Sequence, residues 1–413
     1  MKHITACRVC QSSDIKPFFD LGMQPFANSL LTRPDESERT YPLSLSWCPE
    51  CRLVQLNDTA DPKELFSHYV WVTGTSSTAR EYSKRFYQEV MKRSTLPKSG
   101  YALEIASNDG TFLKPFLAHG HRVLGVDPAG NIAEMARMQG VPTQCAFWGG
   151  ETAQRVVTEH GPAHVVFARN VLPHVANTHD FAEGLGQVLH DDGVLAVEVH
   201  YARIILEGLH YDSIYHEHLC YFTLRSLEHL LNRYGLHVFD ITTSPISGGS
   251  IVVYASRHRR PETASVEEYR RREAEDGIND FAAWESFAQR SFAHRDKLRE
   301  MISTCAASGT VVGYGASARS STLLNFCDID QRMIPVIADQ NPMKQGKYTP
   351  GSHIPIESPE KAMQRQPAYV FILAWNFTDE IVGILENKLG YSGPCIIPLP
   401  EEPSIRHGRA TRN

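Results

Sequence analysis

The stretch Tyr101-Ala102-Leu103-Glu104-Ile105-Ala106-Ser107-Asn108-Asp109-Gly110 decides the fold of the central part of this chain. Its first six residues form a short apolar run typical of a buried parallel strand, and its last four are turn-forming residues that precede a helical pattern. A second apolar strand over 122–126 ends at Asp127, where a carboxylate can accept hydrogen bonds from two ribose hydroxyls. The pattern predicts an α/β sheet that binds a nucleoside.

The residues of this turn indicate which nucleoside binds. A dinucleotide fingerprint uses glycines that let the backbone approach a pyrophosphate, whereas this turn has one glycine and follows a strand that carries a glutamate. A carboxylate repels a pyrophosphate and attracts the ammonium and sulfonium groups of S-adenosylmethionine. The spacing matches the acidic-x-Gly-x-Gly-x-Gly motif of class I methyltransferases with two glycines replaced, so we expect such a Rossmann-like domain. The expected cofactor-binding residues are Glu104, Ala106, Asn108, Gly110, Asp127 and Asn170, the last where the fourth strand should end.

Length, charge and composition exclude several other classes of protein. The chain has 413 residues, 42% of them hydrophobic, which is enough for two to four globular domains. Its formal charge of −6, with interleaved acidic and basic residues, provides no surface for nucleic acid or an anionic membrane. The most apolar stretch, 369–375, is far shorter than the roughly 18–20 residues of a membrane-spanning helix, and the N-terminus lacks the apolar core of a signal peptide. We expect a cytoplasmic protein with a small-molecule partner, as a monomer or homodimer.

Four of the nine cysteines form two Cys-x-x-Cys pairs near the N-terminus, Cys7/Cys10 and Cys48/Cys51. Two such pairs suit a tetrahedral Zn²⁺, because each pair sits on a tight turn that directs two thiolates to one ion. A redox interpretation needs only one pair and leaves the other unexplained. We therefore predict a closed structural zinc site in an N-terminal subdomain. The remaining cysteines are expected to be buried thiols, namely Cys145, Cys220, Cys305, Cys327 and Cys395.

A dense ionisable segment, Tyr215-His216-Glu217-His218, follows the strand expected over 193–199. In an extended segment Tyr215 and Glu217 face one way and the two histidines the other, so one pocket can hold all four only if the backbone turns. Acid–base catalysis is the interpretation that this density favours. The alternatives are a solvated loop with one satisfied histidine, or a metal site, although the helical His-Glu-x-x-His spacing is absent.

Several motifs along the chain resemble those of the sugar C-methyltransferases of deoxysugar biosynthesis. They are the Tyr-His-Glu-His-Leu-x-Tyr-Phe string over 215–222, the cysteine pairs with 22–29 between them, 103–110, 313–316, 322–325 and 350–356. The resemblance covers essentially the whole chain. It implies a three-domain enzyme that transfers a methyl group from S-adenosylmethionine to C-3 of a nucleotide-linked 4-keto-6-deoxysugar.

The residues fit that chemistry. A carbon next to a ketone is acidic enough for a positioned base to remove its proton, and the enolate carbon then attacks the sulfonium methyl. His218 is the expected base because its ordinary pKa lies closest to neutral pH, while Tyr215 and Glu217 orient it or hold the enolate oxygen and sugar hydroxyls. The resemblance adds Tyr69 and His174 to the pocket, where His174 is otherwise a helix-start histidine. His216 is expected to contact the substrate, and Tyr215 and His174 stay open as alternative bases.

The C-terminal part shows a second Rossmann-like pattern. The turn over 313–318 and the acidic Asp339 after the next strand make a fair dinucleotide fingerprint, which leaves a rival interpretation as a bifunctional NAD(P)-linked sugar-modifying enzyme. A helix N-terminus behind a glycine turn can also bind the diphosphate of a nucleotide-sugar. We prefer this interpretation of the C-terminal turn. Candidate contacts are Ser317, Arg319 and Lys344. A non-enzyme alternative is a zinc-ribbon interaction module with a vestigial cofactor domain, which has no use for the segment 215–218.

These patterns divide the chain into four regions. We expect a zinc-binding domain over 1–68, an S-adenosylmethionine-binding domain over 69–258, and a C-terminal Rossmann-like α/β domain over 301–407. Residues 259–300 are charge-rich with helical spacing and alternate in sign, which predicts a solvated helical connector.

Overall fold

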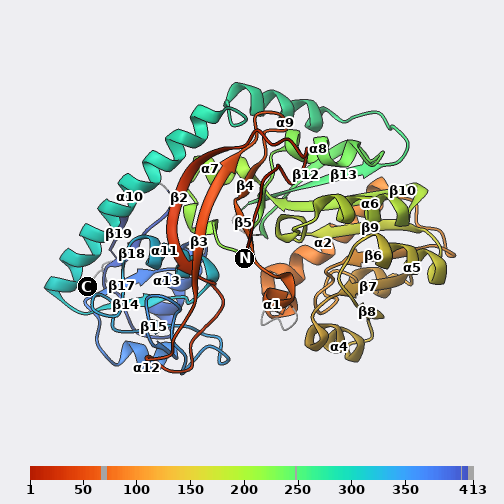
Figure 1. Cartoon of the computed structure of the whole chain (residues 1–413). Coiled ribbons are helices and arrows are strands. Elements are labelled where there is room, and N and C mark those ends of the chain that lie inside the picture. Colours follow the sequence, from red (N-terminus) through yellow and green to blue (C-terminus); the bar gives the residue numbers. More distant parts are fainter. Residues whose placement is uncertain (67–71, 247–248, 401, 408–413) are drawn as a thin grey trace.

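The computed structural model describes residues 1–66, 72–246, 249–400 and 402–407. Figure 1 shows three sheet-based parts: an N-terminal part in red, a central part in gold to green, and a C-terminal part in blue. No helix in the described ranges is both long and apolar enough to cross a membrane.

The N-terminal part is an antiparallel β structure. Two short strands, β1 (Lys2–His3) and β5 (Asp58–Thr59), pair with each other, and α1 (Pro62–Phe66) follows them. The larger sheet has the order β11-β4-β3-β2. Its strands are β2 (Lys16–Pro25), β3 (Thr40–Trp47), β4 (Val54–Leu56) and β11 (Cys220–Tyr221). Because β11 comes from far along the chain, the segment 215–218 is attached directly to this N-terminal sheet.

The central part is a seven-stranded sheet of order β12-β13-β10-β9-β6-β7-β8, in which β13 is antiparallel to both of its neighbours. Its strands are β6 (Tyr101–Ile105), β7 (Arg122–Asp127), β8 (Thr143–Cys145), β9 (Ala163–Arg169), β10 (Leu189–His200), β12 (His237–Ser244) and β13 (Ser250–Ser256). The chain winds outward from β6 to β8 and then returns to β9 on the other side. The carboxyl ends of β6 and β9 therefore form the topological switch point, where such sheets bind ligands. This arrangement confirms the predicted Rossmann-like sheet.

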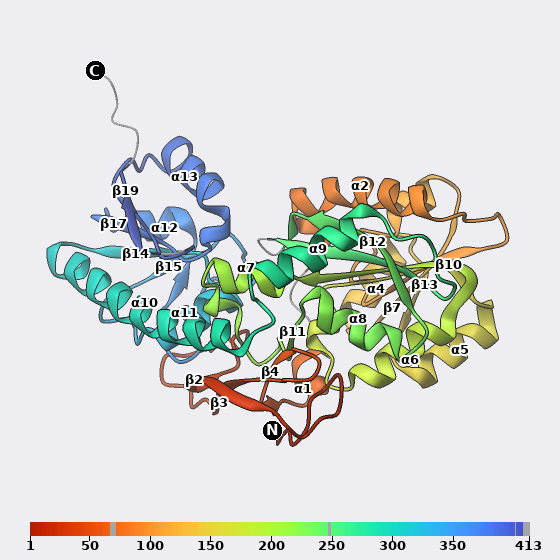
Figure 2. The ribbon, with the colours of Figure 1, turned by 90° about the horizontal axis from the view of Figure 1, so that it is seen from above.

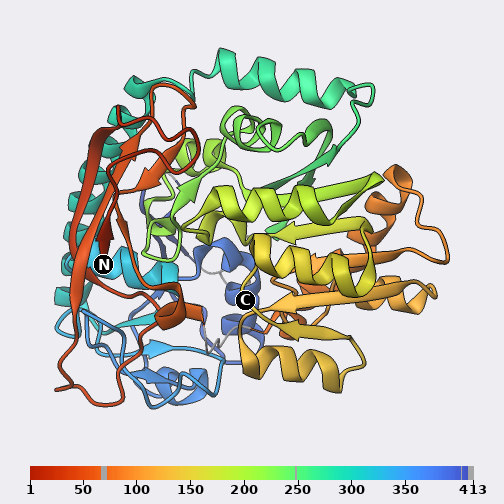
Figure 3. The same ribbon diagram turned by 45° about the vertical axis from the view of Figure 1, so that its right-hand side comes forward.

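Helices cover both faces of this sheet (Figure 3). The α-helices are α2 (Ser77–Arg93), α3 (Lys114–Ala118), α4 (Gly130–Met138), α5 (Gly150–His160), α6 (Thr178–Val188), α7 (Ala202–Glu207) and α8 (Leu224–Asn232), and the short 3-10 helices are η1 (Thr73–Thr75), η2 (Leu172–His174) and η3 (Tyr211–Ser213). Successive strand residues alternate between two apolar cores: Ala102 packs with Phe86 and Phe116, and Leu103 belongs to the core that contains Leu185. Both faces are apolar, which explains the nearly continuous hydrophobic strands.

The C-terminal part is a six-stranded sheet of order β16-β15-β14-β17-β18-β19, parallel except for β19. Its strands are β14 (Val311–Tyr314), β15 (Ile337–Ala338), β16 (Ile356–Glu357), β17 (Tyr369–Ile372), β18 (Cys395–Ile397) and β19 (Ser404–Arg406), and its helices are α11 (Ala318–Phe326), α12 (Pro359–Met363), α13 (Thr378–Asn387) and the 3-10 helix η5 (Trp375–Phe377). This is the second Rossmann-like unit that the sequence predicts.

The predicted connector is helical but not fully solvated. It forms α9 (Ala264–Glu275) and the long α10 (Phe281–Ser308), which runs along the C-terminal part and beside β2 (Figure 2). One face of α10 is buried, and Phe287 and Phe292 lie edge-on to Phe19 of β2 with ring centroids 5.8 and 5.4 Å away. The charge-based prediction was wrong for this face, because apolar residues at helical spacing were hidden among the charged ones.

Candidate active site and metal centre

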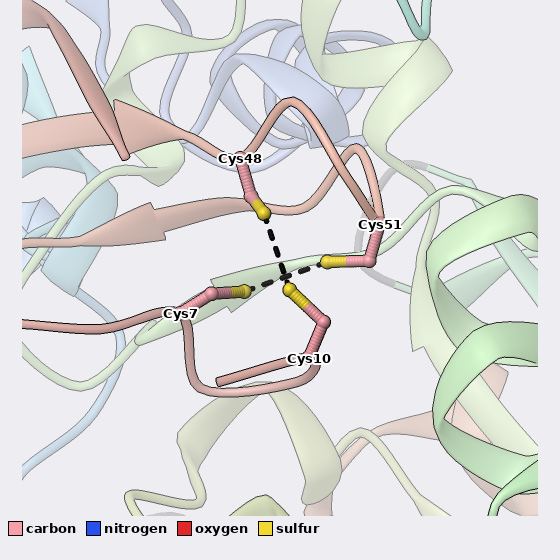
Figure 4. A group of neighbouring side chains, drawn as sticks. All are labelled: Cys7, Cys10, Cys48 and Cys51. Atoms are coloured by element: carbon pink, nitrogen blue, oxygen red, sulfur yellow. Dashed lines mark hydrogen bonds between the residues drawn. The ribbon is translucent and has the colours of Figure 1, made fainter. Parts of the chain in front are cut away.

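The four paired cysteines converge at one point in the N-terminal part (Figure 4). The sulfur atoms all lie within 4.8 Å of one another, with 3.4 Å between those of Cys7 and Cys51 and 3.3 Å between those of Cys10 and Cys48. A tetrahedral ion with Zn–S bonds of about 2.3 Å places its sulfurs roughly 3.8 Å apart, so the cluster fits Zn²⁺ with a small adjustment.

The two Cys-x-x-Cys turns share one backbone geometry. In the first, Gln11 N–H donates to the Cys7 carbonyl at 3.0 Å; in the second, Arg52 N–H donates to the Cys48 carbonyl at 2.9 Å. Gln11 and Arg52 both adopt left-handed backbone, with φ of 65° and 66°. The turns thus direct both thiols of each pair toward the same point, and buried neighbours such as Val9 and Leu53 pack around them. A site with four protein ligands is closed, so the zinc is structural.

The other five cysteines are free thiols, and four of them are buried as expected. Cys145 is the exception: it is exposed at the end of β8. The expectation failed there because β8 is an edge strand of only three residues, and Cys145 is its last residue.

The turn after β6 explains the methyltransferase-like spacing. Ala106, Asn108 and Gly110 have φ of 55°, 50° and 75°, so the alternate positions of the motif all need left-handed backbone. Glycine adopts this conformation without cost, and asparagine tolerates it better than most residues. The backbone N–H of Asn108 donates to Oδ2 of Asp127 at 2.8 Å, and that of Ala129 donates to Oδ1 at 2.9 Å. Asp127 therefore ties β7 to the turn; its contact with a ribose stays a prediction.

Two acceptor atoms at the switch point have no hydrogen-bond partner among the residues that the structure describes. Glu104 is 2% exposed and its Oε2 is unbonded, and burial raises the pKa of this carboxyl well above its usual range. Asn170 donates to Oε1 of Glu198 at 3.1 Å, which leaves its buried Oδ1 unbonded. Unbonded buried acceptors are rare in folded proteins, so a ligand with donors, such as the ammonium of S-adenosylmethionine, fits this edge of the sheet.

Glu198 was missed by the sequence reasoning. It is fully buried on β10 and accepts hydrogen bonds from Arg169 at 2.7 Å, from Asn170, and from the Ser244 hydroxyl at 2.7 Å. These contacts orient the Asn170 amide so that its oxygen is left for a ligand. The signal that could have found it is a single carboxylate within an otherwise apolar strand, because such a group must have buried partners.

The segment 215–218 turns, which brings Tyr215 and His218 to the same side. The backbone N–H of His218 donates to the Tyr215 carbonyl at 2.8 Å, so the alternation of an extended strand does not apply here. The Tyr215 hydroxyl lies 2.7 Å from Nε2 of His218, and Nδ1 of His218 lies 2.7 Å from the Ser213 carbonyl. A carbonyl can only accept, so Nδ1 carries the proton, and neutral His218 accepts the Tyr215 hydroxyl proton at Nε2.

His174 joins this pair from the end of β9. Its ring centroid is 4.9 Å from that of His218, and its Nδ1 donates to the Glu217 carbonyl at 2.7 Å. Burial lowers the pKa of both imidazoles, and burial, with His174 beside it as a smaller cause, holds the pKa of His218 well below its usual range. Both rings are therefore neutral near pH 7, the form of an imidazole that can take up a proton.

Glu217 and His216 contact the N-terminal part instead. Glu217 is 5% exposed, its Oε1 accepts from Nδ2 of Asn28 at 2.6 Å, and burial raises its pKa to about 7. His216 lies edge-on to Phe26, with Nε2 3.3 Å from the Pro42 carbonyl. Sequence reasoning did not single out Asn28, although it belongs to the quoted motif 22–29. Substrate contact by His216 stays a prediction, and Tyr69 lies outside the described residues.

In the C-terminal part, the three residues expected to contact a diphosphate form hydrogen bonds to other groups of the protein. The Ser317 hydroxyl caps α11 by accepting from Ser320 N–H at 3.1 Å, and Nζ of Lys344 donates to the Ala316 carbonyl at 2.6 Å. Arg319 forms a two-pronged ion pair with Asp212, at 3.0 and 2.9 Å. Among the described residues, none of the buried side-chain polar atoms that lack a partner belongs to this part. Diphosphate binding by these residues stays a prediction.

Two solved structures align with less than half of this chain. One is magnesium protoporphyrin IX methyltransferase from Synechocystis PCC 6803 with bound S-adenosylmethionine, at 13% identity, a TM-score of 0.33, and coverage of 43% of this chain and 79% of that one. The other is the YcgJ protein of Bacillus subtilis, with 13% identity, a TM-score of 0.33 and coverage of 43% and 100%.

Family models match most of the chain: residues 7–66 match a zinc binding domain, 78–241 a methyltransferase domain, and 245–400 a C-methyltransferase C-terminal domain. The chain is also 35% identical to the C-methyltransferase NovU of Streptomyces niveus. This alignment extends over 409 residues and covers 97% of each chain. With the Rossmann-like sheet, these matches identify S-adenosylmethionine as the cofactor and zinc as the structural metal. This chain therefore belongs to the C-methyltransferase family that its motifs resemble, and it is an S-adenosylmethionine-dependent C-methyltransferase.

Proposed function

We propose that this enzyme methylates C-3 of a nucleotide-linked 4-keto-6-deoxysugar, by removal of the C-3 proton and attack of the resulting enolate on the methyl donor. The observation that carries the proposal is the Tyr215–His218 pair, a hydroxyl and an imidazole nitrogen 2.7 Å apart. A ketone and the acidic carbon beside it present an acceptor oxygen and a proton at a similar spacing. One pair of side chains can therefore serve both atoms.

The hydrogen bond between the pair must be exchanged when the substrate binds. In the free enzyme the Tyr215 hydroxyl donates a hydrogen bond to Nε2 of His218. When that hydroxyl donates to the C-4 carbonyl oxygen instead, Nε2 is free to accept the C-3 proton. Tyr215 then stabilises the negative charge that develops on the oxygen, which is the role of an oxyanion donor.

Bond making and breaking balance in this scheme. His218 takes the C-3 proton, and C-3 uses the electron pair left behind to form a bond to the methyl group. The bound cofactor would supply that methyl as an electrophile, with loss of its methyl–sulfur bond, whose electron pair would stay on the now neutral sulfur. Nδ1 of His218 stays bonded to the Ser213 carbonyl, which stabilises the imidazolium until it releases its proton to solvent. Glu217, with a pKa of about 7, can exchange protons at working pH.

The decisive experiment is a substrate panel. Purified enzyme is incubated with S-adenosylmethionine and a set of thymidine- and guanosine-diphosphate 4-ketosugars, and mass spectrometry detects the gain of one methyl group. NMR of the product locates the new carbon. Methylation at oxygen, or at a carbon not adjacent to the ketone, contradicts the proposal. A panel in which the matching sugars without the 4-keto group react equally well contradicts it too, because the enolate then has no role.

A further inference from the structure

A buried cluster of three residues, Asp212, Arg319 and Trp375, joins the C-terminal part to the segment that carries the proposed base. We call this cluster the clasp. Asp212 of η3 is 1% exposed, and both of its oxygens are bound by residues of the C-terminal part. Nε and Nη2 of Arg319 donate to it at 3.0 and 2.9 Å, and Nε1 of Trp375 donates to Oδ2 at 2.7 Å. The Arg319 guanidinium also lies 4.6 Å from the centroid of the Trp375 ring.

The clasp surrounds the carbonyl that sets the tautomer of His218. Ser213, whose carbonyl accepts from Nδ1 of His218 at 2.7 Å, directly follows Asp212. On its other side, the hydroxyl of Thr322 on α11 donates to the Ile214 carbonyl at 2.9 Å. Residues of the C-terminal part therefore anchor the backbone immediately before and after Ser213. The position of this carbonyl is fixed across a domain boundary.

We propose that Arg319 and Trp375 are positioning residues, which hold Asp212 so that the Ser213 carbonyl keeps the proton on Nδ1 of His218 and leaves Nε2 as the acceptor. This inference rests on the proposed function, in which His218 is the base. It gives the C-terminal part a role in the chemistry of proton transfer. Arg319 uses two of its three nitrogens on a buried carboxylate, a geometry that only the guanidinium fork provides.

The test uses Arg319→Lys, Arg319→Ala and Trp375→Phe in the full-length enzyme. Lysine keeps the charge but not the fork, and phenylalanine keeps the ring but not the N–H donor. The matched control is Arg365→Lys, because Arg365 also forms a two-pronged pair, with Glu357, at an exposed position of the same part. For Arg319→Ala we expect kcat to fall by about 10²-fold, the cost typical of a misplaced catalytic group. The KM for the nucleotide-sugar and the Kd for S-adenosylmethionine stay within about twofold of wild type.

Rescue and tautomer measurements separate positioning from general damage. Guanidinium chloride at a sub-denaturing concentration restores kcat of Arg319→Ala, whereas sodium chloride does not. Long-range ¹H–¹⁵N spectra of ¹⁵N-histidine-labelled enzyme, with His218 identified by its loss in His218→Gln, show the Nδ1–H tautomer in wild type. In the clasp variants they show a mixture of tautomers.

Three outcomes overturn the proposal. If KM rises and kcat is unchanged, Arg319 binds the substrate diphosphate instead. If Arg365→Lys loses as much activity, the effect is general stability. If the His218 tautomer is unchanged in every clasp variant, the Ser213 carbonyl does not depend on the clasp. The spectra need no substrate, so failure of this inference is visible even if the substrate panel disproves the proposed function.

Discussion

At the scale of single residues, environment separates groups that look alike in the sequence. His216 and His218 are two positions apart, yet one packs among aromatic side chains of the N-terminal part and the other pairs with Tyr215. Glu104 and Glu217 are both buried carboxyls. Among the described residues, Oε2 of Glu104 has no hydrogen-bond partner, whereas Oε1 of Glu217 accepts from the Asn28 amide. These differences lead to three predictions.

Replacing the base should abolish proton removal and leave cofactor binding intact. For His218→Ala we expect kcat to fall by roughly 10²–10⁴-fold, the range for a lost general base, with nearly unchanged S-adenosylmethionine affinity. Deuterium exchange at the carbon next to the ketone, measured with S-adenosylhomocysteine in place of the donor, should disappear. If His218→Ala still exchanges at the wild-type rate and Tyr215→Phe does not, Tyr215 is the base. If neither change matters, His174 is the next candidate.

Glu217 should make the protein less stable as pH rises. Burial raises its folded-state pKa to about 7, above the ordinary value near 4.5, so its stabilising contribution is full below pH 4.5 and is lost as pH rises to 7. The corresponding free energy is at most about 3 kcal/mol. Glu217→Gln should therefore melt at a higher temperature than wild type at pH 8, with a much smaller difference at pH 5. The exposed Glu151→Gln serves as control, and equal shifts at both pH values would refute the assignment.

Glu104 should contribute directly to cofactor affinity. Glu104→Gln keeps the shape of the side chain but removes its ability to carry a negative charge next to an ammonium or sulfonium. A hydrogen bond to a charged group is worth about 1.5–3 kcal/mol, which corresponds to a loss of affinity of roughly 10–150-fold. Calorimetric titration with S-adenosylmethionine measures it, with the exposed Glu134→Gln as control. Unchanged affinity in Glu104→Gln would place the ammonium elsewhere.

At the scale of elements, the N-terminal sheet links the metal to the active site. Antiparallel pairing of β11 with β4, Cys220 opposite Gln55 and Tyr221 opposite Val54, attaches the segment 215–218 to strands that the zinc site ties together. The Asn28–Glu217 hydrogen bond is a second connection between the same two regions. Metal and active site are therefore coupled through backbone pairing, although zinc takes no part in the chemistry.

Zinc removal should destabilise the first 66 residues and abolish turnover, because without the ion the two cysteine turns lose the bonds that tie them together. Complete chelation should lower the melting temperature and increase amide hydrogen exchange over 1–66 and 215–222, while S-adenosylmethionine still binds the central sheet. Cys48→Ser should behave similarly, and Cys145→Ser, at an exposed thiol, is the control. Full stability and activity after complete chelation would contradict a structural role.

At the scale of the whole molecule, the two Rossmann-like parts differ in what their turns leave unsatisfied. Both tie the acidic residue of the second strand to the turn: Asp339 accepts from Ala316 N–H at 2.8 Å, as Asp127 does from Asn108. The central edge retains unbonded buried atoms, whereas in the C-terminal part Lys344 satisfies the Ala316 carbonyl. Between the two Rossmann-like parts, as far as the structure describes them, buried side-chain polar atoms without a partner occur in the central one and not in the C-terminal one.

The whole enzyme should therefore bind S-adenosylmethionine and neither NAD nor NADP. Titration of the full chain with each of the three, under the same conditions, measures this directly. Lys344→Ala is titrated in the same way, because this change removes the ammonium that donates to the Ala316 carbonyl in the turn of the C-terminal part. Tight NAD binding by the wild type would revive the interpretation as a nicotinamide-linked enzyme.

The sequence by itself determined the features that local chemistry dictates. The turn 106–110 has left-handed backbone at alternate positions, and the residue types of Asn108 and Gly110 indicate it for two of the three. The cysteine spacing predicts two tight turns that direct thiols to one ion, and apolar runs of strand length predict both Rossmann-like sheets. Each of these depends on contacts within a few residues of the chain, so the residues concerned can be recognised from the printed sequence.

Only the tertiary structure decided what each ionisable group does. The segment 210–221 meets Asn28 and Pro42 from the N-terminal part, and Arg319 and Trp375 from the C-terminal part. The burial of Glu217 and the buried face of α10 follow from partners far along the chain: Asn28 lies 189 residues from Glu217, and Phe19 lies 268 residues from Phe287. Local periodicity carries no information on such partners, because protonation and burial depend on which distant groups the folded chain brings within a few ångströms.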